Sequence, residues 1–237
     1  TTTPWTLPAN NGLAVGKKID YVLIETFNKY SKKKVRVVLA KNCINKFFSE
    51  DNHVGGQIKF KENHLEYKVI KQIKGSEMCG LDYHQLLPYV KVNKPALSII
   101  HGDFVSTDEG TGIVHISLTF GSDDFMVSRK NNMPGVFVKD DNNEDVPIVD
   151  KNGKFVDEIT DFAGMEVKNF SDELSDQLST DEKISIKLKQ ENKAFDVKKY
   201  IHSYPHCWRT DKPILYYPLE SWFINTTKLK SKFIELN

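Results

Sequence analysis

One stretch of the sequence brings a histidine and two carboxylates close together. His115 follows a short apolar pair, and the acidic pair Asp123-Asp124 comes soon after it, beyond the glycine at position 121. A histidine and a carboxylate that share a cleft can orient a water molecule or bind an ammonium group. Acid–histidine pairs are often merely structural, with a partly buried histidine and a solvated loop aspartate. The residues alone therefore leave both roles open.

Three consecutive threonines form a second candidate. Thr1-Thr2-Thr3 offers several hydroxyl groups on a backbone that β-branched residues keep extended. These hydroxyls could line a small polar pocket, although composition alone favours an edge strand rich in threonine. Thr1 could also act as a nucleophile activated by its own amine. We discount that option because the sequence opens without a methionine, as a domain cut from a longer chain would.

An aromatic-rich stretch near the end of the sequence contains two histidines and a cysteine. His202, His206 and Cys207 are close in sequence, but a zinc site needs three or four ligands with suitable spacing. Cys43 and Cys79 each lack a nearby partner cysteine. We therefore expect aromatic packing here rather than a metal. The sequence also lacks a phosphate-binding loop and a serine nucleophile elbow, so it gives no support to ATP hydrolysis or serine-esterase chemistry.

The composition limits the classes of partner. The 237 residues carry 33 basic and 32 acidic side chains, for a net charge of +1, which excludes a nucleic-acid binder that relies on global charge. A local basic patch is still compatible with these numbers. The 3 cysteines are scattered and odd in number, which favours a reducing compartment over a disulfide framework. No apolar run approaches the roughly 20 residues that cross a bilayer.

The elements that must position these residues are short. Hairpins are predicted over 21–40 and over 147–156, the second around an Asn-Gly turn. Other segments that read as strands or extended chain are 1–6, 13–15, 67–73, 96–100, 104–106 and 113–114. Helices are predicted at 41–50, at 75–81 with Ser76 as a cap, at 123–132 and within 171–191. Together they predict an α+β fold, an antiparallel β-barrel core with peripheral short helices.

Three motifs resemble one family of enzyme domains. The segments 1–10, 110–125 and 202–209 occur in the order found in the editing domain of the class I aminoacyl-tRNA synthetases for Ile, Val and Leu. They read Thr-Thr-Thr-Pro-Trp-Thr-Leu-Pro-Ala-Asn, then Gly-Thr-Gly-Ile-Val-His with a later Gly-Ser-Asp-Asp-Phe, then His-Ser-Tyr-Pro-His-Cys-Trp-Arg with a later Ser-Trp-Phe at 221–223. The form of 203–209 favours the isoleucyl branch. The resemblance covers essentially the whole chain.

The resemblance implies hydrolysis of mischarged Val-tRNA(Ile), with valyl-adenylate as a further substrate left open. A pocket fitted to valine would clash with the extra methylene of isoleucine, at a cost of about 1–3 kcal/mol. We expect a positioned water to attack the ester carbonyl without a covalent intermediate. Two alternatives stay open: a tRNA 3′-end binding module with weak or lost hydrolysis, and an editing domain of the valyl or leucyl type. Ser117-Leu118, which replaces the family's usual Ala-Pro, motivates the first.

The same resemblance assigns roles to individual residues. Asp124 would bind the α-ammonium group of the substrate through a charge-assisted hydrogen bond, whereas Asp123 is more variable in such enzymes. His115 would contact the terminal adenosine or help to place water. Phe120 would form an apolar wall near the valyl side chain, Trp5 would pack beside the pocket and Asn10 would support the threonines. The catalytic set is Asp124, His115, Thr2 and Thr3; the substrate-binding set is Thr1, Thr2, Thr3, Trp5, Asn10, Gly110, Thr111, His115, Phe120 and Asp124, with no metal ligand.

The family also implies a context. Residues 1–200 would be the editing domain, and 201–237 a return segment packed on the same domain and leading towards an absent catalytic domain. We expect no cofactor here, because ATP and magnesium would belong to that catalytic domain. The implied partners are the 3′ end of tRNA(Ile) carrying valine and the rest of the synthetase chain, in a cytoplasmic monomer without a membrane. Thr1 and 221–224 are expected to lie close together, as in an inserted domain.

Overall fold

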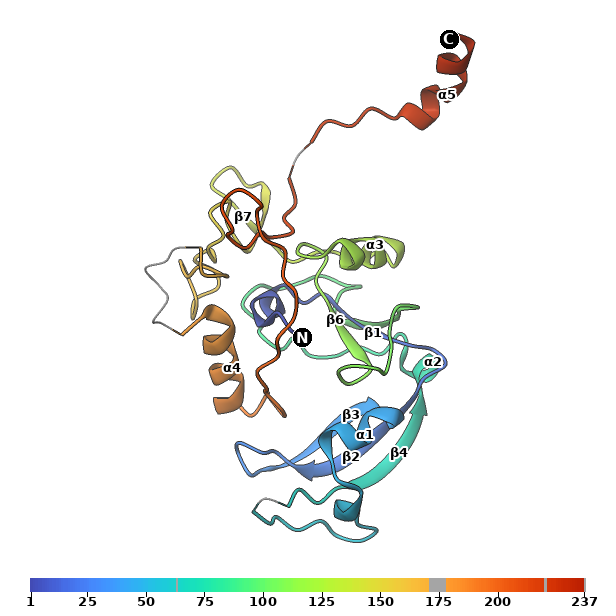
Figure 1. Ribbon diagram of the computed structural model, residues 1–237, viewed down its shortest axis with the longest axis vertical. Helices are drawn as coiled ribbons and strands as arrows, with labels where there is room; N and C mark the ends of the chain where they lie inside the picture. Colours follow the sequence, from blue (N-terminus) through green and yellow to red (C-terminus); the bar gives the residue numbers. More distant parts are fainter. Residues whose placement is uncertain (63, 171–177, 220, 237) are drawn as a thin grey trace.

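A computed structural model describes residues 1–62, 64–170, 178–219 and 221–236. A small central sheet carries the histidine of interest (Figure 1). Its order is β5-β1-β6, formed by Ser98–His101, Gly12–Val15 and Ile113–Ile116. Strand β1 runs parallel to β5 and antiparallel to β6, so that Leu13 lies opposite His115. The alternating Ile-Val-His-Ile sequence of β6 buries Ile116 fully and leaves His115 on the other face of the strand.

A second sheet is antiparallel and has the order β3-β2-β4. The predicted hairpin is confirmed as β2 (Asp20–Phe27) and β3 (Lys34–Ala40), and β4 (Lys68–Lys74) pairs with the other edge of β2. The β-branched residues of β2 pack one face of this sheet into a core with Leu39, Phe48 and Tyr67. Short helices follow β3: η2 (Lys41–Cys43), α1 (Ile44–Phe47) and η3 (Glu50–Asn52).

The remaining elements surround the central sheet. The short helix η1 (Pro4–Ala9) leads into β1, α2 (Gly75–Met78) follows β4, and α3 (Ser122–Lys130) follows β6. A two-stranded sheet of β7 (Phe137–Lys139) and β8 (Asp145–Pro147) comes next. Helices α4 (Thr180–Gln190) and α5 (Thr226–Glu235) complete the chain. Trp5 of η1, Ile148 after β8 and Ile184 of α4 belong to one buried cluster, which holds η1 and α4 together.

The prediction of an antiparallel barrel is wrong. In the part of the chain that the structure describes, the strands form three separate open sheets, and the pair β1–β5 is parallel. The fold is α+β with small sheets. Strand patterns predict which segments are extended, but register and partner depend on contacts between segments that are distant in sequence. Here a long connection between β1 and β5 allows the parallel pairing.

Several local predictions also need correction. Residues 4–9 are a 3₁₀ helix rather than an extended strand, because Pro4 suits a first helical turn and the backbone N–H of Thr6 bonds to the carbonyl of Thr3. Ser76 is not a cap, since α2 already begins at Gly75. Residues 104–106 form no strand, and the 147–156 hairpin is reduced to bridge contacts such as Val149 with Phe155. Helix α4 supports the helical pattern within 171–191, of which 171–177 lies outside the described residues.

The end of the chain leaves the body of the protein. Tyr217 still donates a hydrogen bond from its hydroxyl to the carbonyl of Val149 at 3.0 Å. Beyond it, Trp222 and Phe223 are 103% and 89% exposed, and α5 buries none of its residues. In Figure 1 this segment extends away from the body, whereas the N-terminus lies near its centre. The expected approach of Thr1 to 221–224 is therefore not found.

Candidate functional site

The imidazole of His115 is held at both nitrogens. Its Nδ1 lies 2.7 Å from Nδ2 of Asn10, and its Nε2 lies 3.0 Å from Oγ1 of Thr6. Thr6 lies in η1, and Asn10 directly follows this helix. The chain then enters β1, which pairs with β6, the strand of His115. The 3₁₀ turn thus places both partners over the ring.

The environment keeps His115 neutral. Burial lowers the pKa of its imidazole to about 3. A neutral ring whose two nitrogens are both occupied has no free lone pair for a substrate proton. His115 is therefore suited to orienting other groups rather than to acting as a general base in this arrangement.

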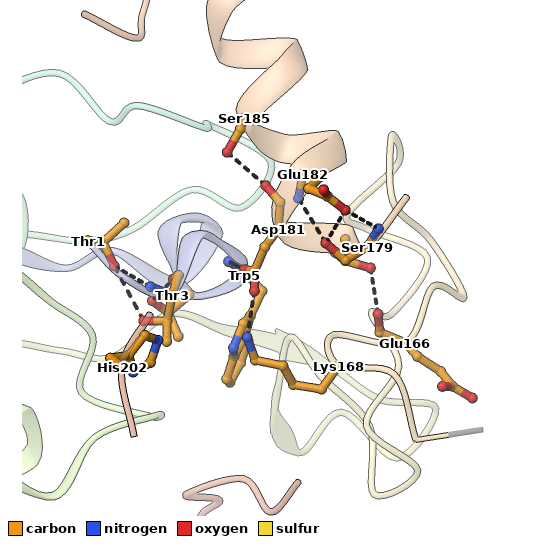
Figure 2. A network of polar contacts seen from close by, with 12 residues as sticks. Thr1, Thr3, Trp5, Glu166, Lys168, Ser179, Asp181, Glu182, Ser185 and His202 are labelled. Atoms are coloured by element: carbon orange, nitrogen blue, oxygen red, sulfur yellow. Dashed lines mark hydrogen bonds and ion pairs between the residues drawn. The ribbon is translucent and has the colours of Figure 1, made fainter. Parts of the chain in front are cut away.

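The three threonines form a turn ahead of η1. Thr1 accepts a hydrogen bond at its Oγ1 from the N–H of Thr3 at 3.1 Å, and the two hydroxyl oxygens lie 3.3 Å apart (Figure 2). The hydroxyl of Thr6 donates to the carbonyl of Thr3 at 2.8 Å. Thr1 and Thr2 are exposed and Thr3 is half-buried. The structure thus brings Thr3 to His115 through Thr6, while Thr2 is open to solvent.

The carboxylate of Asp124 sits at the start of α3 beside the end of β6. Its Oδ2 accepts a hydrogen bond from the N–H of Ser117 at 2.9 Å. Burial raises the pKa of this carboxyl; the Ser117 N–H opposes that rise and the neighbouring Asp123 adds to it. Among the described residues, Asp124 has no ion-pair partner and Oδ1 has no hydrogen-bond donor. A cation that reached Oδ1 would stabilise the ionised form.

Ser117-Leu118 is fixed despite the missing proline. The N–H of Leu118 donates to Oδ1 of Asn11 at 3.2 Å, a bond that a proline nitrogen could not make. Together with the bond from Ser117 to Asp124, it ties the turn between β6 and α3 at two consecutive residues. The backbone that sets Asp124 is thus restrained by hydrogen bonds in this sequence.

The two aromatic residues of the predicted site are part of the core. The rings of Trp5 and Phe120 meet edge to face, with centroids 5.0 Å apart, and both side chains are buried. The backbone N–H of Trp5 donates to Oδ1 of Asp181 at 2.8 Å, while Oδ2 of Asp181 pairs with Lys168 at 2.5 Å (Figure 2). Trp5 and Phe120 therefore pack η1 onto the core, and their buried side chains are not exposed to a ligand.

Gly110 and Thr111 lie at a different place. The carbonyl of Thr111 accepts a hydrogen bond from the N–H of Ala40 in β3, and Thr111 lines an apolar cavity of about 230 Å³ with Phe47, Phe48 and Phe195 among its walls. Gly110 is exposed in a left-handed turn with φ +63°. Among the described residues, neither Gly110 nor Thr111 has a hydrogen bond to His115, Asn10 or Thr6.

Sequence reasoning missed three residues that this site uses. Thr6 hydrogen-bonds to His115, and Tyr83 hydrogen-bonds to Asn10. Asp181 of α4 accepts a hydrogen bond from the backbone N–H of Trp5. Thr6 lies three residues after Thr3, the spacing of a 3₁₀ contact, which is a signal that could have found it. Tyr83 and Asp181 are remote in sequence and offered no signal.

Two kinds of feature are absent from the described residues. No group of three or more His, Cys, Asp or Glu side chains among them gathers as a metal ion would require. No helix in the same part of the chain has the length and apolar character of a membrane span. Neither result identifies a substrate.

The chain is similar to known proteins along its whole length. The isoleucine–tRNA ligase of Cytophaga hutchinsonii is 50% identical over 251 residues, and those of Bacteroides fragilis and Clostridium tetani are 43% and 37% identical. The matches cover 100% of this chain but only 23%, 22% and 19% of the respective relatives. No family model matches.

Two solved structures have a similar but distant arrangement. A leucyl-tRNA synthetase CP1 fragment titled GlLeuRS-CP1 is 12% identical with a TM-score of 0.45, covering 84% of this chain and 83% of that one. The editing domain of the cytosolic leucyl-tRNA synthetase of P. knowlesi is 20% identical with a TM-score of 0.40, covering 56% and 50%. The sequence matches alone carry the assignment: the chain corresponds to a segment of isoleucine–tRNA ligase.

Proposed function

We propose that this segment edits: it hydrolyses the ester of Val-tRNA(Ile) and so removes valine that was attached in error. The observation that carries the proposal is the unpaired, half-buried carboxylate of Asp124 beside the strand of His115, in a chain 50% identical to an isoleucine–tRNA ligase. An aminoacyl ester presents an α-ammonium group, the cation that such a carboxylate would bind. The reaction consumes one water and releases valine and the free tRNA hydroxyl.

Each group has a defined part in this proposal. Asp124 holds the ammonium and thereby fixes the ester carbonyl relative to the threonine turn. Hydroxyl and backbone groups of Thr2 and Thr3 then orient the attacking water, which gains from proximity rather than from a strong base. His115 cannot supply that base while its ring is neutral and held at both nitrogens. No covalent intermediate is needed.

Selection between valine and isoleucine depends on space. A pocket bounded by fixed side chains resists an added methylene, since overpacking costs about 1–3 kcal/mol. The partly buried hydrogen bonds from Thr6 and Asn10 to His115 would make the adjoining part of such a pocket stiff. We further propose that the chain acts with the 3′ end of tRNA(Ile) and the rest of a synthetase, in the cytoplasm as a monomer, and needs no cofactor for this step.

The test is deacylation under single-turnover conditions, with the chain in excess over radiolabelled Val-tRNA(Ile). The proposal expects valine release well above the rate without protein. The alternative is a module that binds the tRNA end without hydrolysis; the changed Ser117-Leu118 sequence motivated it, although hydrogen bonds hold that turn in this chain. It predicts a filter-binding signal for Val-tRNA(Ile) with valine release at the uncatalysed rate, and that pair of results would replace the editing proposal.

A further inference from the structure

A chain of hydrogen bonds runs from a distant loop to the threonine turn. Tyr83 lies between α2 and β5, and its hydroxyl donates to Oδ1 of Asn10 at 2.5 Å. Asn10 contacts His115, His115 contacts Thr6, and Thr6 contacts the carbonyl of Thr3. We propose that Tyr83 and Thr6 are positioning residues, which act through Asn10 and His115 to fix the threonine turn for ester hydrolysis. This inference rests on the proposed editing function.

Asn10 determines which groups donate and which accept in this series of hydrogen bonds. Its Nδ2 also lies within 2.9 Å of the carbonyl of Gly12 and 3.2 Å of the carbonyl of Ile116. Carbonyl oxygens only accept, so this end of the side chain must be the NH₂ group and the other end must be the oxygen. The Tyr83 hydroxyl therefore donates to Asn10, and burial, which raises the pKa of that hydroxyl, keeps its proton in place.

The orientation of Asn10 selects one tautomer of His115. Because the Asn10 amide faces Nδ1 with a donor, Nδ1 must accept and carry no proton. The neutral ring then bears its proton on Nε2, which donates to Oγ1 of Thr6. If the Asn10 amide were flipped, its oxygen would face the carbonyl oxygens of Gly12 and Ile116, which is repulsive. The hydrogen bond from Tyr83 to Oδ1 therefore stabilises the orientation that these two carbonyls require.

Thr6 links His115 to the threonine turn. Its hydroxyl accepts from His115 and therefore has its own proton free for the carbonyl of Thr3 at 2.8 Å. Thr3 in turn donates its N–H to Thr1, so the hydroxyl groups of the turn are set relative to β6. Thr6 is buried and Tyr83 is half-buried, and neither belongs to the threonine turn itself. Their effect on hydrolysis would be indirect, through geometry.

The first experiment reads the tautomer directly and needs no substrate. Nitrogen NMR of the histidine-labelled chain, with the His115 signals assigned by the variant His115→Gln, distinguishes a protonated Nε2 from a protonated Nδ1. The expected result at neutral pH is a single, neutral Nε2–H form. A protonated Nδ1, or a rapid mixture of both forms, would overturn the proposed chain of bonds.

The second experiment removes the Tyr83 hydroxyl. Tyr83→Phe leaves Oδ1 of Asn10 without a donor, and we expect a second His115 tautomer to appear and kcat for valine release to fall about tenfold with little change in KM. Tyr89→Phe is the matched control, because the Tyr89 hydroxyl also donates to one side chain, Oδ2 of Asp161 at 2.5 Å, away from His115. Loss of stability in Tyr83→Phe with unchanged His115 signals and unchanged kcat would refute the positioning role.

The third experiment tests Thr6 by two substitutions, one that removes the hydroxyl and one that keeps it. Thr6→Val keeps the shape but removes the hydroxyl, so kcat should fall about tenfold, whereas Thr6→Ser should restore most of it. Equal activity of Thr6→Val and Thr6→Ser would contradict the role of the hydroxyl. Failure of the editing proposal is separable from these outcomes: a wild-type chain with the expected His115 tautomer that releases no valine refutes the function and leaves the hydrogen-bond chain intact.

Discussion

Nδ2 of Asn10 lies 2.7 Å from Nδ1 of His115, and this contact makes the histidine an acceptor at the nitrogen that a general base would use. The same ring donates from its other nitrogen to Thr6. His115 therefore links the segment before β1 to β6, and the proposed hydrolytic site includes this link. The carboxylate of Asp124 is tied to the same strand end through Ser117.

Removing the charge of Asp124 should disable hydrolysis with little effect on folding. Asp124→Asn retains an oxygen for the Ser117 N–H but loses the charge that would bind the α-ammonium group. A hydrogen bond to a charged group is worth up to about 3 kcal/mol, so we expect about a hundredfold loss in kcat/KM. Single-turnover deacylation and urea unfolding measure the two effects. The neighbouring variant Asp123→Asn serves as the control, and equal losses in both variants would contradict the assignment.

Acid should weaken the fold through His115. Its pKa is about 3 in the folded chain and near 6.5 when unfolded, so the unfolded state binds the extra proton between these values. Stability therefore falls as the pH falls through this window. Between pH 7 and pH 5 the linked loss is about 2 kcal/mol. Urea unfolding of the wild-type chain and of His115→Gln at both pH values isolates the effect; parallel losses would show that His115 titrates normally in the folded chain.

Valine release should show no inflection near the ordinary histidine pKa. The ring stays neutral down to about pH 3, so its protonation does not control the rate near neutrality. The measurement is the single-turnover rate between pH 5.5 and pH 8, a range set by the reference pKa of about 6.5. A rate that falls with an apparent pKa close to that value, and loses this step in His115→Gln, would make His115 a titrating catalyst instead.

Asp181 should matter more for stability than an ordinary surface aspartate. It accepts from the backbone N–H of Trp5 and pairs with Lys168, so Asp181→Ala leaves that N–H without its acceptor and Lys168 without its ion pair. The expected loss is about 2–3 kcal/mol of unfolding free energy, measured with urea. Asp145→Ala removes the exposed pair with Lys139 and should cost less than about 1 kcal/mol. Similar losses in the two variants would show that Asp181 does not anchor η1.

The sequence predicted local elements better than their pairing. The β2–β3 hairpin and α3 follow from alternation and helical spacing within single segments, and both are found. The parallel pairing of β1 with β5 was not predicted, because no local pattern encodes which strand lies beside β1. Helix α5 was also missed, since its exposed apolar residues give no buried face within this chain.

The site was predicted in part. The motifs at 1–10 and 110–125 do meet, because η1 and β1 bring Asn10 and the threonine turn onto β6. Trp5 was expected to pack beside the pocket and Phe120 to form its apolar wall; both are buried and packed edge to face, and these two roles stay predictions. Tyr83 was missed because its part depends on a contact across the fold.

The measurement that tests the central claim most directly compares two substrates in one assay. The chain is mixed in excess with Val-tRNA(Ile) or Ile-tRNA(Ile), and the first-order release of each amino acid is followed. We expect fast release of valine and slow release of isoleucine, with a rate ratio of about five or more, because a methylene clash costs about 1–3 kcal/mol. Equal rates for the two substrates, or valine release no faster than without protein, would contradict it.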